Sequence, residues 1–319
     1  MSTLKEGAID DLRRASLSYA ALCSWSSAGL FDALADDQAR SASELGVSAR
    51  GLEVTGQVLR SVGLVEVDEG RWRLSHAGLA LQRGGALNLG KPEEFFRKLA
   101  GVGSALVTGD PLERRDIGVD QSDPARTRAF LEMLYRRSGE SAVETARLLS
   151  SRIHSGAKVL DLGGGHGRYG EELRSACDAR VTLLDLEVSI GVAQQRYGTD
   201  QSYVVGDFMS CDLGSDYDVV LASNVVHGLG PDQLSLLLPR LATSLAPDGL
   251  LVLKDMFIGG GCAPGLAESF GMQMLIGTAE GRSYSLEQIT DLLDGAGFSV
   301  VECLPVPECD FSLLISRQS

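Results

Sequence analysis

Apolar residues recur at helical spacing through the first third of the chain, and two short alternating stretches follow them. The predicted elements are helices over residues 10–35, 43–46 and 50–62 and strands over residues 65–67 and 72–75. Ser41 and Glu44 have the spacing of a capping box, and Asp68, Glu69 and Gly70 form a turn between the two strands. Three helices closed by a hairpin predict a winged-helix layout, which we place in residues 1–95.

The periodicity changes from Lys158 onward, where apolar strands alternate with helices in the manner of βαβ units. The predicted strands cover residues 158–161, 181–185, 202–205, 219–222, 250–255, 299–304 and 311–317. The last two lie close together and predict an antiparallel hairpin. We therefore expect a Rossmann-like, seven-stranded, doubly wound α/β domain over residues 151–319. Residues 96–150 are predicted to be linking helices, one of which runs over residues 126–153.

The charge of the chain argues against nucleic acid as a partner. Lys and Arg total 29 and Asp and Glu total 43, which gives a net charge of −14. A winged helix can bind DNA, and Arg50, Thr55 and Gln57 lie on the candidate recognition helix, but Glu53 lies there too. The apolar first helix offers the alternative, a homodimer interface in the N-terminal domain. We therefore predict dimerisation and no nucleic acid.

Neither a metal nor a membrane is predicted. The six cysteines include no CxxC pair, and only four histidines are present, so the usual metal-ligand spacings are missing. The apolar stretch at residues 15–34 contains several serines and Asp32, which a membrane span disfavours. The first residues lack the apolar core of a secretory signal. We expect a cytoplasmic protein with reduced thiols.

A glycine-rich segment follows the first predicted strand of the α/β domain. Residues 165–170 satisfy the pattern GxGxxG, which is found in dinucleotide sites, so an NAD(P) oxidoreductase is one alternative. Gly163 and Gly165 allow the backbone to approach a ligand closely. Asp161, at the strand end, would repel a pyrophosphate and attract a cationic ligand that lacks phosphate. Asp161 therefore favours a cationic nucleoside ligand over a dinucleotide such as NAD(P).

Two more acidic residues follow the next strands. Asp185 ends the second strand, where a carboxylate accepts hydrogen bonds from ribose hydroxyls. Asp207 follows the third strand and could accept from an adenine amine while Phe208 packs against the ring. Each aspartate alone could cap a loop. Three at successive strand ends of one sheet favour a nucleoside site.

These motifs resemble those of the class I S-adenosylmethionine-dependent methyltransferases, and in particular the small-molecule O-methyltransferases that carry an N-terminal winged-helix dimerisation domain. The resembling segments are residues 160–167, 184–186 and 206–208 in the nucleotide site, 281–282 and 296–298 near the C-terminus, and 31–34 and 59–65 in the N-terminal domain. The resemblance implies transfer of a methyl group from S-adenosylmethionine to a small-molecule, natural-product-type acceptor, with S-adenosylhomocysteine as product.

The resemblance also implies roles for individual residues in holding the cofactor. The Gly163–Gly165 backbone would hold the methionine moiety, Asp185 and Leu186 the ribose, and Asp207 and Phe208 the adenine. Ser223 and Ser138 are similar to positions that touch the cofactor, and Asp161 belongs to the same site.

His227 matches the general base of the family, and Asp255 resembles a carboxylate that orients it; the alternative for His227 is a helix cap. Phe270, Met272 and Asn224 are predicted to contact the acceptor.

The chain departs from the family pattern at two positions beside the predicted base. Gly228 replaces the acid that usually follows the histidine, and Ser283 replaces a second flanking acid. A hydroxyl acceptor is the first prediction. The departures leave open C-, N- or S-methylation, or a non-methylating enzyme on the same scaffold.

Overall fold

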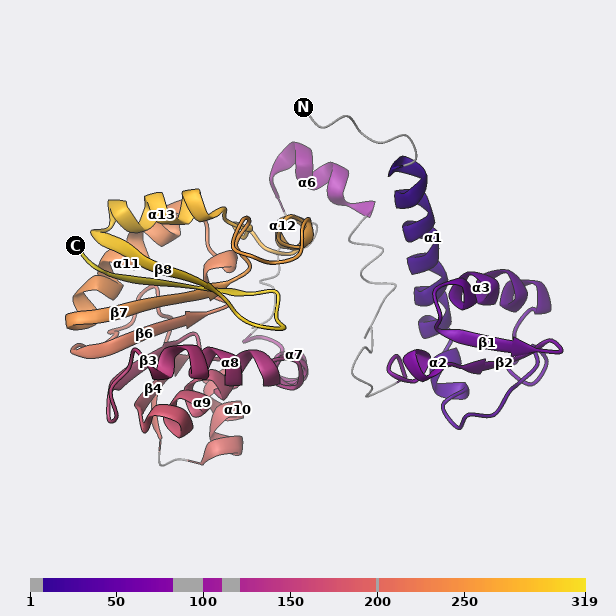
Figure 1. The fold of residues 1–319 in the computed structure, drawn as a ribbon, viewed down its shortest axis with the longest axis horizontal. Coiled ribbons are helices and arrows are strands. Elements are labelled where there is room, and N and C mark those ends of the chain that lie inside the picture. Colours follow the sequence, from indigo (N-terminus) through magenta and orange to yellow (C-terminus); the bar gives the residue numbers. More distant parts are fainter. Residues whose placement is uncertain (1–7, 83–99, 111–120, 199–200) are drawn as a thin grey trace. The chain divides into compact units, whose positions relative to one another are not determined.

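The computed structural model describes residues 8–82, 100–110, 121–198 and 201–319 and divides the chain into two compact units, Met1–Ala100 and Gly101–Ser319 (Figure 1). The predicted domain boundary at residue 95 lies outside the described residues. The predicted linking helices after residue 120 fall within the second unit.

The N-terminal unit packs its helices and a hairpin around two tryptophans. Its elements are α1 (Ala8–Ser27), α2 (Leu30–Ala33), α3 (Ala49–Ser61), β1 (Val65–Asp68), β2 (Arg71–Leu74) and α4 (His76–Leu79). The predicted helix over 10–35 is interrupted, because Gly29 adopts a left-handed φ of 71° between α1 and α2. Trp25 and Trp72 meet edge to face at 6.2 Å and are both buried. Gly56 of α3 gives Trp72 its space, since a Cβ there would lie 2.5 Å from the indole.

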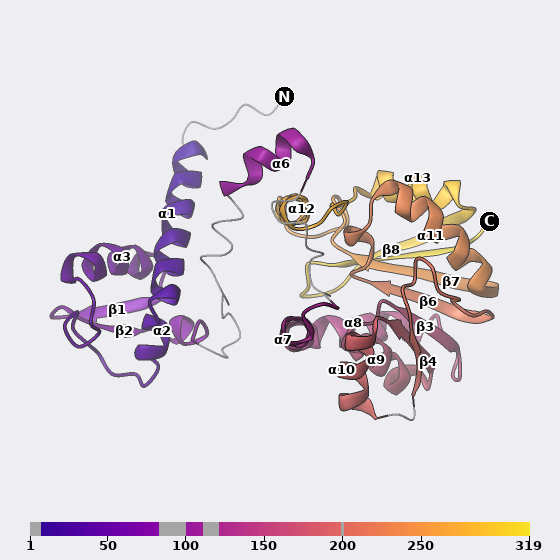
Figure 2. The same cartoon turned by 180° about the vertical axis from the view of Figure 1, so that it is seen from behind.

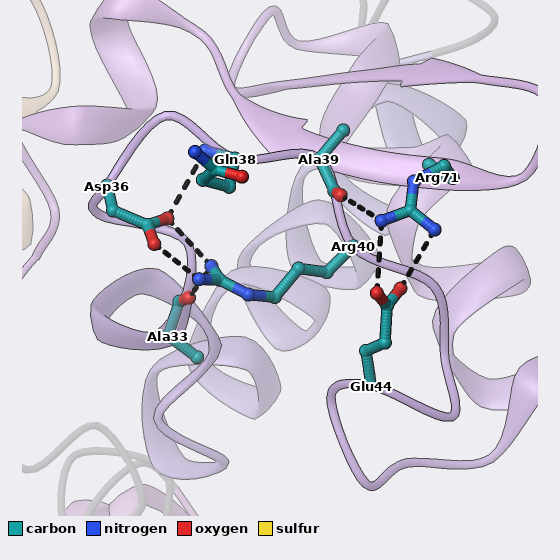
Figure 3. A network of polar contacts seen from close by, with 7 residues as sticks. All are labelled: Ala33, Asp36, Gln38, Ala39, Arg40, Glu44 and Arg71. Carbon is teal, nitrogen blue, oxygen red and sulfur yellow. Dashed lines mark hydrogen bonds and ion pairs between the residues drawn. The ribbon is translucent and has the colours of Figure 1, made fainter.

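The predicted helix over residues 43–46 is wrong, because this segment forms turns. The capping contact itself is present, since the Ser41 amide donates to Glu44 Oε2 at 2.7 Å. The same carboxylate pairs with Arg71 of β2 at 3.0 Å, and Arg40 binds Asp36 alongside (Figure 3). The segment is therefore tied to the hairpin.

Two of the three candidate DNA-reading side chains of α3, Thr55 and Gln57, are engaged within the unit. Trp25 Nε1 donates to Thr55 Oγ1 at 2.8 Å, and the Thr55 hydroxyl donates to the Gly51 carbonyl at 2.7 Å. Gln57 donates to Glu53 at 3.0 Å. These bonds favour a structural role for α3 over base recognition.

The second unit is built on one seven-stranded sheet of order β5-β4-β3-β6-β7-β9-β8 (Figure 1). The strands are β3 (Lys158–Leu162), β4 (Arg180–Asp185), β5 (Ser202–Val205), β6 (Tyr217–Ser223), β7 (Leu245–Asp255), β8 (Phe298–Pro305) and β9 (Ser312–Gln318). The five neighbouring strands β5, β4, β3, β6 and β7 are parallel to one another, and β9 is antiparallel to both of its neighbours. The predicted seven-stranded α/β fold is confirmed.

Helices cover both faces of this sheet (Figures 1 and 2). The helices of the unit are α6 (Val102–Thr108), α7 (Pro124–Arg137), α8 (Gly139–Ser150), α9 (Arg168–Cys177), α10 (Glu187–Tyr197), the short 3-10 helix η1 (Val226–Gly228), α11 (Pro231–Ser244), α12 (Leu266–Gly277) and α13 (Leu286–Gly295). One core contains leucines of α11 and α13, and the other contains residues of α8 and α9. In open α/β sheets of this kind, ligands bind beside the carboxyl ends of the parallel strands.

The single helix predicted over 126–153 is wrong, because the structure breaks it at Ser138 into α7 and α8. The Arg168 guanidinium explains the break. It would lie 3.3 Å from a Cβ at Gly139, and it donates to the Tyr135 carbonyl at 2.9 Å. Arg168 and the Ser138 hydroxyl thus bind the Tyr135 carbonyl, which a continuous helix would pair with the Gly139 amide.

Among the described residues, no helix is both long and apolar enough to cross a membrane. All six cysteines lie in the described part of the chain, and none is in a disulfide.

Candidate active site

The glycine loop between β3 and α9 depends on backbone conformations that other residues rarely adopt. Gly163, Gly165 and Gly167 have φ values of 64°, 56° and 77°. A Cβ at Gly163 would lie 2.9 Å from Val225 and 3.5 Å from the Phe208 ring. The loop thus brings bare backbone beside the aromatic side chain that follows β5. This is a cradle that fits a nucleoside with a short polar tail.

Asp161 lies beneath the loop and is fully buried. Its Oδ2 accepts from the Gly170 amide at 3.2 Å and would lie 2.6 Å from a Cβ at Gly164. Burial raises the pKa of Asp161 to about 7, despite the Gly170 bond. The buried carboxyl therefore supports the loop from below, and its place in the cofactor site stays a prediction.

Asp185 lies at the end of β4 and links that strand to the glycine loop. Its two oxygens accept from the amides of Gly165 at 2.8 Å and Leu186 at 2.6 Å. Burial raises the pKa of Asp185, and these backbone bonds oppose the increase. The side chain is 8% exposed, so it lies at the border of the loop rather than below it.

Asp207 and Phe208 follow β5 on the neighbouring edge of the site. Asp207 is exposed and its Oδ1 accepts from the Met209 amide at 2.8 Å, which is the loop cap considered above. Arg240 of α11 donates to the carbonyls of Phe208 and Cys211 and fixes this turn. The hydrogen bond of this turn goes to Asp207 Oδ1 and not to Oδ2.

The two predicted serines lie on different elements of the second unit. Ser223 ends β6 and is 9% exposed, and Ser138 lies at the break between α7 and α8 and is 8% exposed. The Ser138 hydroxyl donates to the Tyr135 carbonyl at 3.1 Å. Leu131 of α7 would lie 3.3 Å from a Cβ at Gly165, so α7 packs against the loop.

His227 and Asp255 form a hydrogen-bonded dyad beside this cradle. His227 Nδ1 lies 2.9 Å from Asp255 Oδ1 and 3.0 Å from Oδ2, and the His227 amide donates to Oδ2 at 3.1 Å. Burial raises the pKa of Asp255, but His227 and the Met256 amide outweigh burial and hold it below its usual value. An ionised carboxylate only accepts, so Nδ1 carries a proton, and in the neutral imidazole the lone pair is on Nε2. The dyad presents a base.

An aromatic ring and a serine occupy the predicted surroundings of His227. The Phe270 ring meets the imidazole edge to face at 4.8 Å. Met272, on the same helix, is 44% exposed. Ser283 donates to the Ala267 carbonyl at 2.6 Å, which ties it to α12. Phe270 is therefore the predicted acceptor residue that the structure places against the base.

Sequence reasoning missed Lys254, which is fully buried beside Asp255. Its Nζ donates to Asn224 Oδ1 at 3.2 Å and lies 3.3 Å from the centre of the Phe311 ring. Burial lowers the pKa of Lys254 to about 7, although Asp255 and Cys309 oppose the decrease. The sequence feature that could have revealed it is a lysine that directly follows the apolar residues 250–253 of β7, because a lysine is rarely fully buried.

Within the described ranges, no group of three His, Cys, Asp or Glu side chains is placed to hold a metal ion.

Comparison with known proteins assigns the chain to a family. Residues 86–299 match the family of O-methyltransferase domains. The chain belongs to this family. The predicted family is thereby confirmed, and membership disfavours the alternative of an NAD(P) oxidoreductase.

Three relatives illustrate the range of the family. The 3-amino-4-hydroxybenzoate 4-O-methyltransferase of Streptomyces cremeus is 25% identical over 221 residues, 67% of this chain and 60% of that protein. The phenazine-1-carboxylate N-methyltransferase of Pseudomonas aeruginosa is 27% identical over 225 residues, 67% of this chain and 66% of that protein. The 3-hydroxy-5-methyl-1-naphthoate 3-O-methyltransferase of Streptomyces sahachiroi is 28% identical over 298 residues, 86% and 84% of the two chains. The match thus spans less than two thirds of the first two relatives.

Solved structures share the fold over nearly the whole chain. Mitomycin 7-O-methyltransferase matches with a TM-score of 0.81 at 19% identity, covering 98% of this chain and 97% of that one. Human N-acetylserotonin methyltransferase, in complex with S-adenosylmethionine, matches with a TM-score of 0.76 at 20% identity, covering 100% and 99%. The family and the fold together support S-adenosylmethionine as the cofactor.

Proposed function

We propose that this protein is an S-adenosylmethionine-dependent methyltransferase that methylates a hydroxyl group on a small aromatic acceptor. The observation that carries the proposal is the His227–Asp255 dyad, with Nδ1 at 2.9 Å from the carboxylate, beside the glycine cradle. The three relatives are named for aromatic acids or their hydroxylated forms, which supports an acceptor of natural-product type.

The cofactor supplies an electrophilic methyl group on a sulfonium. The backbone from Gly163 to Gly165 would hold its methionine part, and Asp185 with Leu186 would hold the ribose hydroxyls. Asp207 Oδ2 would accept from the adenine amine, and the Phe208 ring, beside Gly163, would pack against the base. Ser138 and Ser223 would border the same space, while Asp161 supports the loop from below.

His227 removes the proton of the acceptor hydroxyl at its Nε2 atom. Asp255 keeps the imidazole in the tautomer that this step requires and stabilises the cation that results. Phe270 would pack against a flat acceptor and keep water from the nucleophile, and alignment of that oxygen with the methyl group supplies much of the rate. Met272 and Asn224 would complete the acceptor side.

N-methylation is the second candidate. Ser283 and Gly228 leave the base with one acidic partner, and an amine acceptor needs less base catalysis than a hydroxyl. A relative named for N-methylation supports this alternative.

The experiment is incubation of the full chain with S-adenosylmethionine and a panel of hydroxylated and aminated aromatic acids, with mass spectrometry for one added methyl group. O-methylation that falls at least a hundredfold in His227→Ala supports the proposal. N-methylation that survives this substitution would replace it with the second candidate, and no product with any acceptor would count against both.

We also propose a homodimer that forms through the N-terminal domain. Ile9, Leu12 and Leu17 of α1 are 54%, 63% and 66% exposed, an apolar surface that a second copy would cover. Light scattering should give twice the mass of one chain, and Leu12→Glu with Leu17→Glu should give the mass of a single chain. A single-chain mass for the unmodified protein would refute the dimer. A cytoplasmic location stays a prediction.

A further inference from the structure

The last two residues of β7 hold the two ends of one short segment. Lys254 and Asp255 point to opposite faces of the sheet, as neighbours on a strand do. The Asn224 amide donates to the Lys254 carbonyl at 2.8 Å, and the His227 amide donates to Asp255 Oδ2 at 3.1 Å. The segment from Asn224 to His227 is thus fixed at its start by Lys254 and at its end by Asp255. Asp255 has a role in the proposed reaction, whereas Lys254 so far has none.

Lys254 is costly to bury, and its surroundings compensate only partly. The side chain is 0% exposed, and its Nζ lies 3.3 Å from the Phe311 ring centre and 4.8 Å from that of Tyr169. Its Nζ donates a hydrogen bond to a side chain, Asn224 Oδ1, at 3.2 Å. A methionine would fill the same apolar space without this cost. The charge is therefore best explained by what it does to Asn224.

The contact with Lys254 decides which end of the Asn224 amide a ligand meets. The protonated form of Lys254 only donates, so in that form the side-chain oxygen of Asn224 faces Lys254 and the NH2 group points elsewhere. The Tyr169 hydroxyl is within hydrogen-bonding reach of Asn224, and an NH2 group has a second hydrogen to give. Asn224 is half-buried and has a left-handed φ of 58°, which its short amide tolerates. The site therefore offers an oriented donor three residues before His227.

We propose that Lys254 is a positioning residue that fixes Asn224 as a hydrogen-bond donor, and that this donor binds a ligand carboxylate. The inference rests on the proposed function. The carboxylate could belong to the methionine part of the cofactor or to an aromatic acid acceptor. Both sources present the same chemistry, a planar anion whose oxygens accept the amide hydrogen while the buried cation lies behind the amide.

Two substitutions test the proposal in the full chain. Lys254→Met keeps the length and apolar contacts of the side chain but releases the amide. Asn224→Asp keeps a contact with Lys254, as an ion pair, but presents an acceptor that repels a carboxylate. Lys158→Met is the matched control, because Lys158 also lies over an aromatic ring, 4.6 Å from the centre of Tyr217, at the opposite end of the parallel strands. Circular dichroism checks that each variant is folded.

Calorimetry then compares two pairs of probes. The first pair is S-adenosylhomocysteine and its decarboxylated analogue; the second is 1-hydroxy-2-naphthoate and 1-naphthol, titrated into the S-adenosylhomocysteine-loaded protein. We expect both substitutions to weaken the carboxylate member of one pair at least tenfold and to leave its partner unchanged, while Lys158→Met changes neither. Which pair responds identifies the source of the carboxylate.

The proposal is overturned if neither pair separates the variants from the unmodified protein, or if both members of a pair weaken equally. If Lys254→Met fails to fold, the result for Asn224→Asp decides alone. Failure of the proposed function has a different signature, since the unmodified protein would then not bind S-adenosylhomocysteine.

Discussion

Gly164 is the position where the packing under the glycine loop can be tested most sharply. A Cβ at Gly164 would lie 2.6 Å from Asp161 Oδ2, 2.7 Å from Asp161 Cγ and 2.9 Å from Leu183 Cγ. Both neighbours are buried, at 0% and 2% exposure, so neither has solvent to move into. The backbone of Gly164 is not left-handed, so the cost of Gly164→Ala comes from packing alone.

Overpacking of this kind costs about 1–3 kcal/mol. For a unit of this size, each kcal/mol lowers the melting temperature by about 2–4 °C, and the displaced loop should bind S-adenosylhomocysteine at least tenfold more weakly. Calorimetry and thermal unfolding measure the two effects. Gly228→Ala is the matched control, because no atom lies within 4 Å of a Cβ there and the residue is adjacent to His227. If Gly164→Ala melts and binds like the unmodified protein, the account of Asp161 as a buried support is refuted.

Three further predictions follow from other contacts. Asp255→Asn should lower kcat by about a hundredfold or more, measured with the acceptor from the methylation panel, because an amide no longer fixes the tautomer of His227; an unchanged kcat would contradict the dyad. Asp161 has a folded pKa of about 7, above its unfolded value, so the native state binds the extra proton and stability should fall as pH rises from about 4 to 7. Asp161→Asn should reduce this slope in denaturant titrations, and an unchanged slope would assign it to another group, such as Asp185. Thr55→Val should destabilise the N-terminal unit by about 1 kcal/mol through loss of the Trp25 bond, and an unchanged unfolding midpoint would show that this bond contributes nothing.

The sheet could be predicted because its information is local. Runs of apolar residues bounded by glycine and acidic residues mark each strand, and β3 and β4 begin and end within a residue of the prediction. The three aspartates at successive strand ends could be found for the same reason, since parallel strands bring their carboxyl ends to one edge.

The features that the sequence did not reveal depend on residues far apart along the chain. The break at Ser138 is imposed by Arg168 of the next helix but one, and residues 43–46 are held as turns by Arg71 of the hairpin. Burial of Asp161 beneath the loop follows from packing against Gly164. The role of Lys254 could not be predicted because both of its contacts are distant in sequence. Asn224 lies 30 residues before it, and Phe311 lies between the last two strands.

The most direct test of the central claim is calorimetric titration of the full chain with S-adenosylhomocysteine, run beside NAD and repeated on Asp185→Ala. The account predicts micromolar binding of S-adenosylhomocysteine, at least tenfold weaker in Asp185→Ala, and no binding of NAD. Absence of S-adenosylhomocysteine binding, or tight binding of NAD, would contradict it.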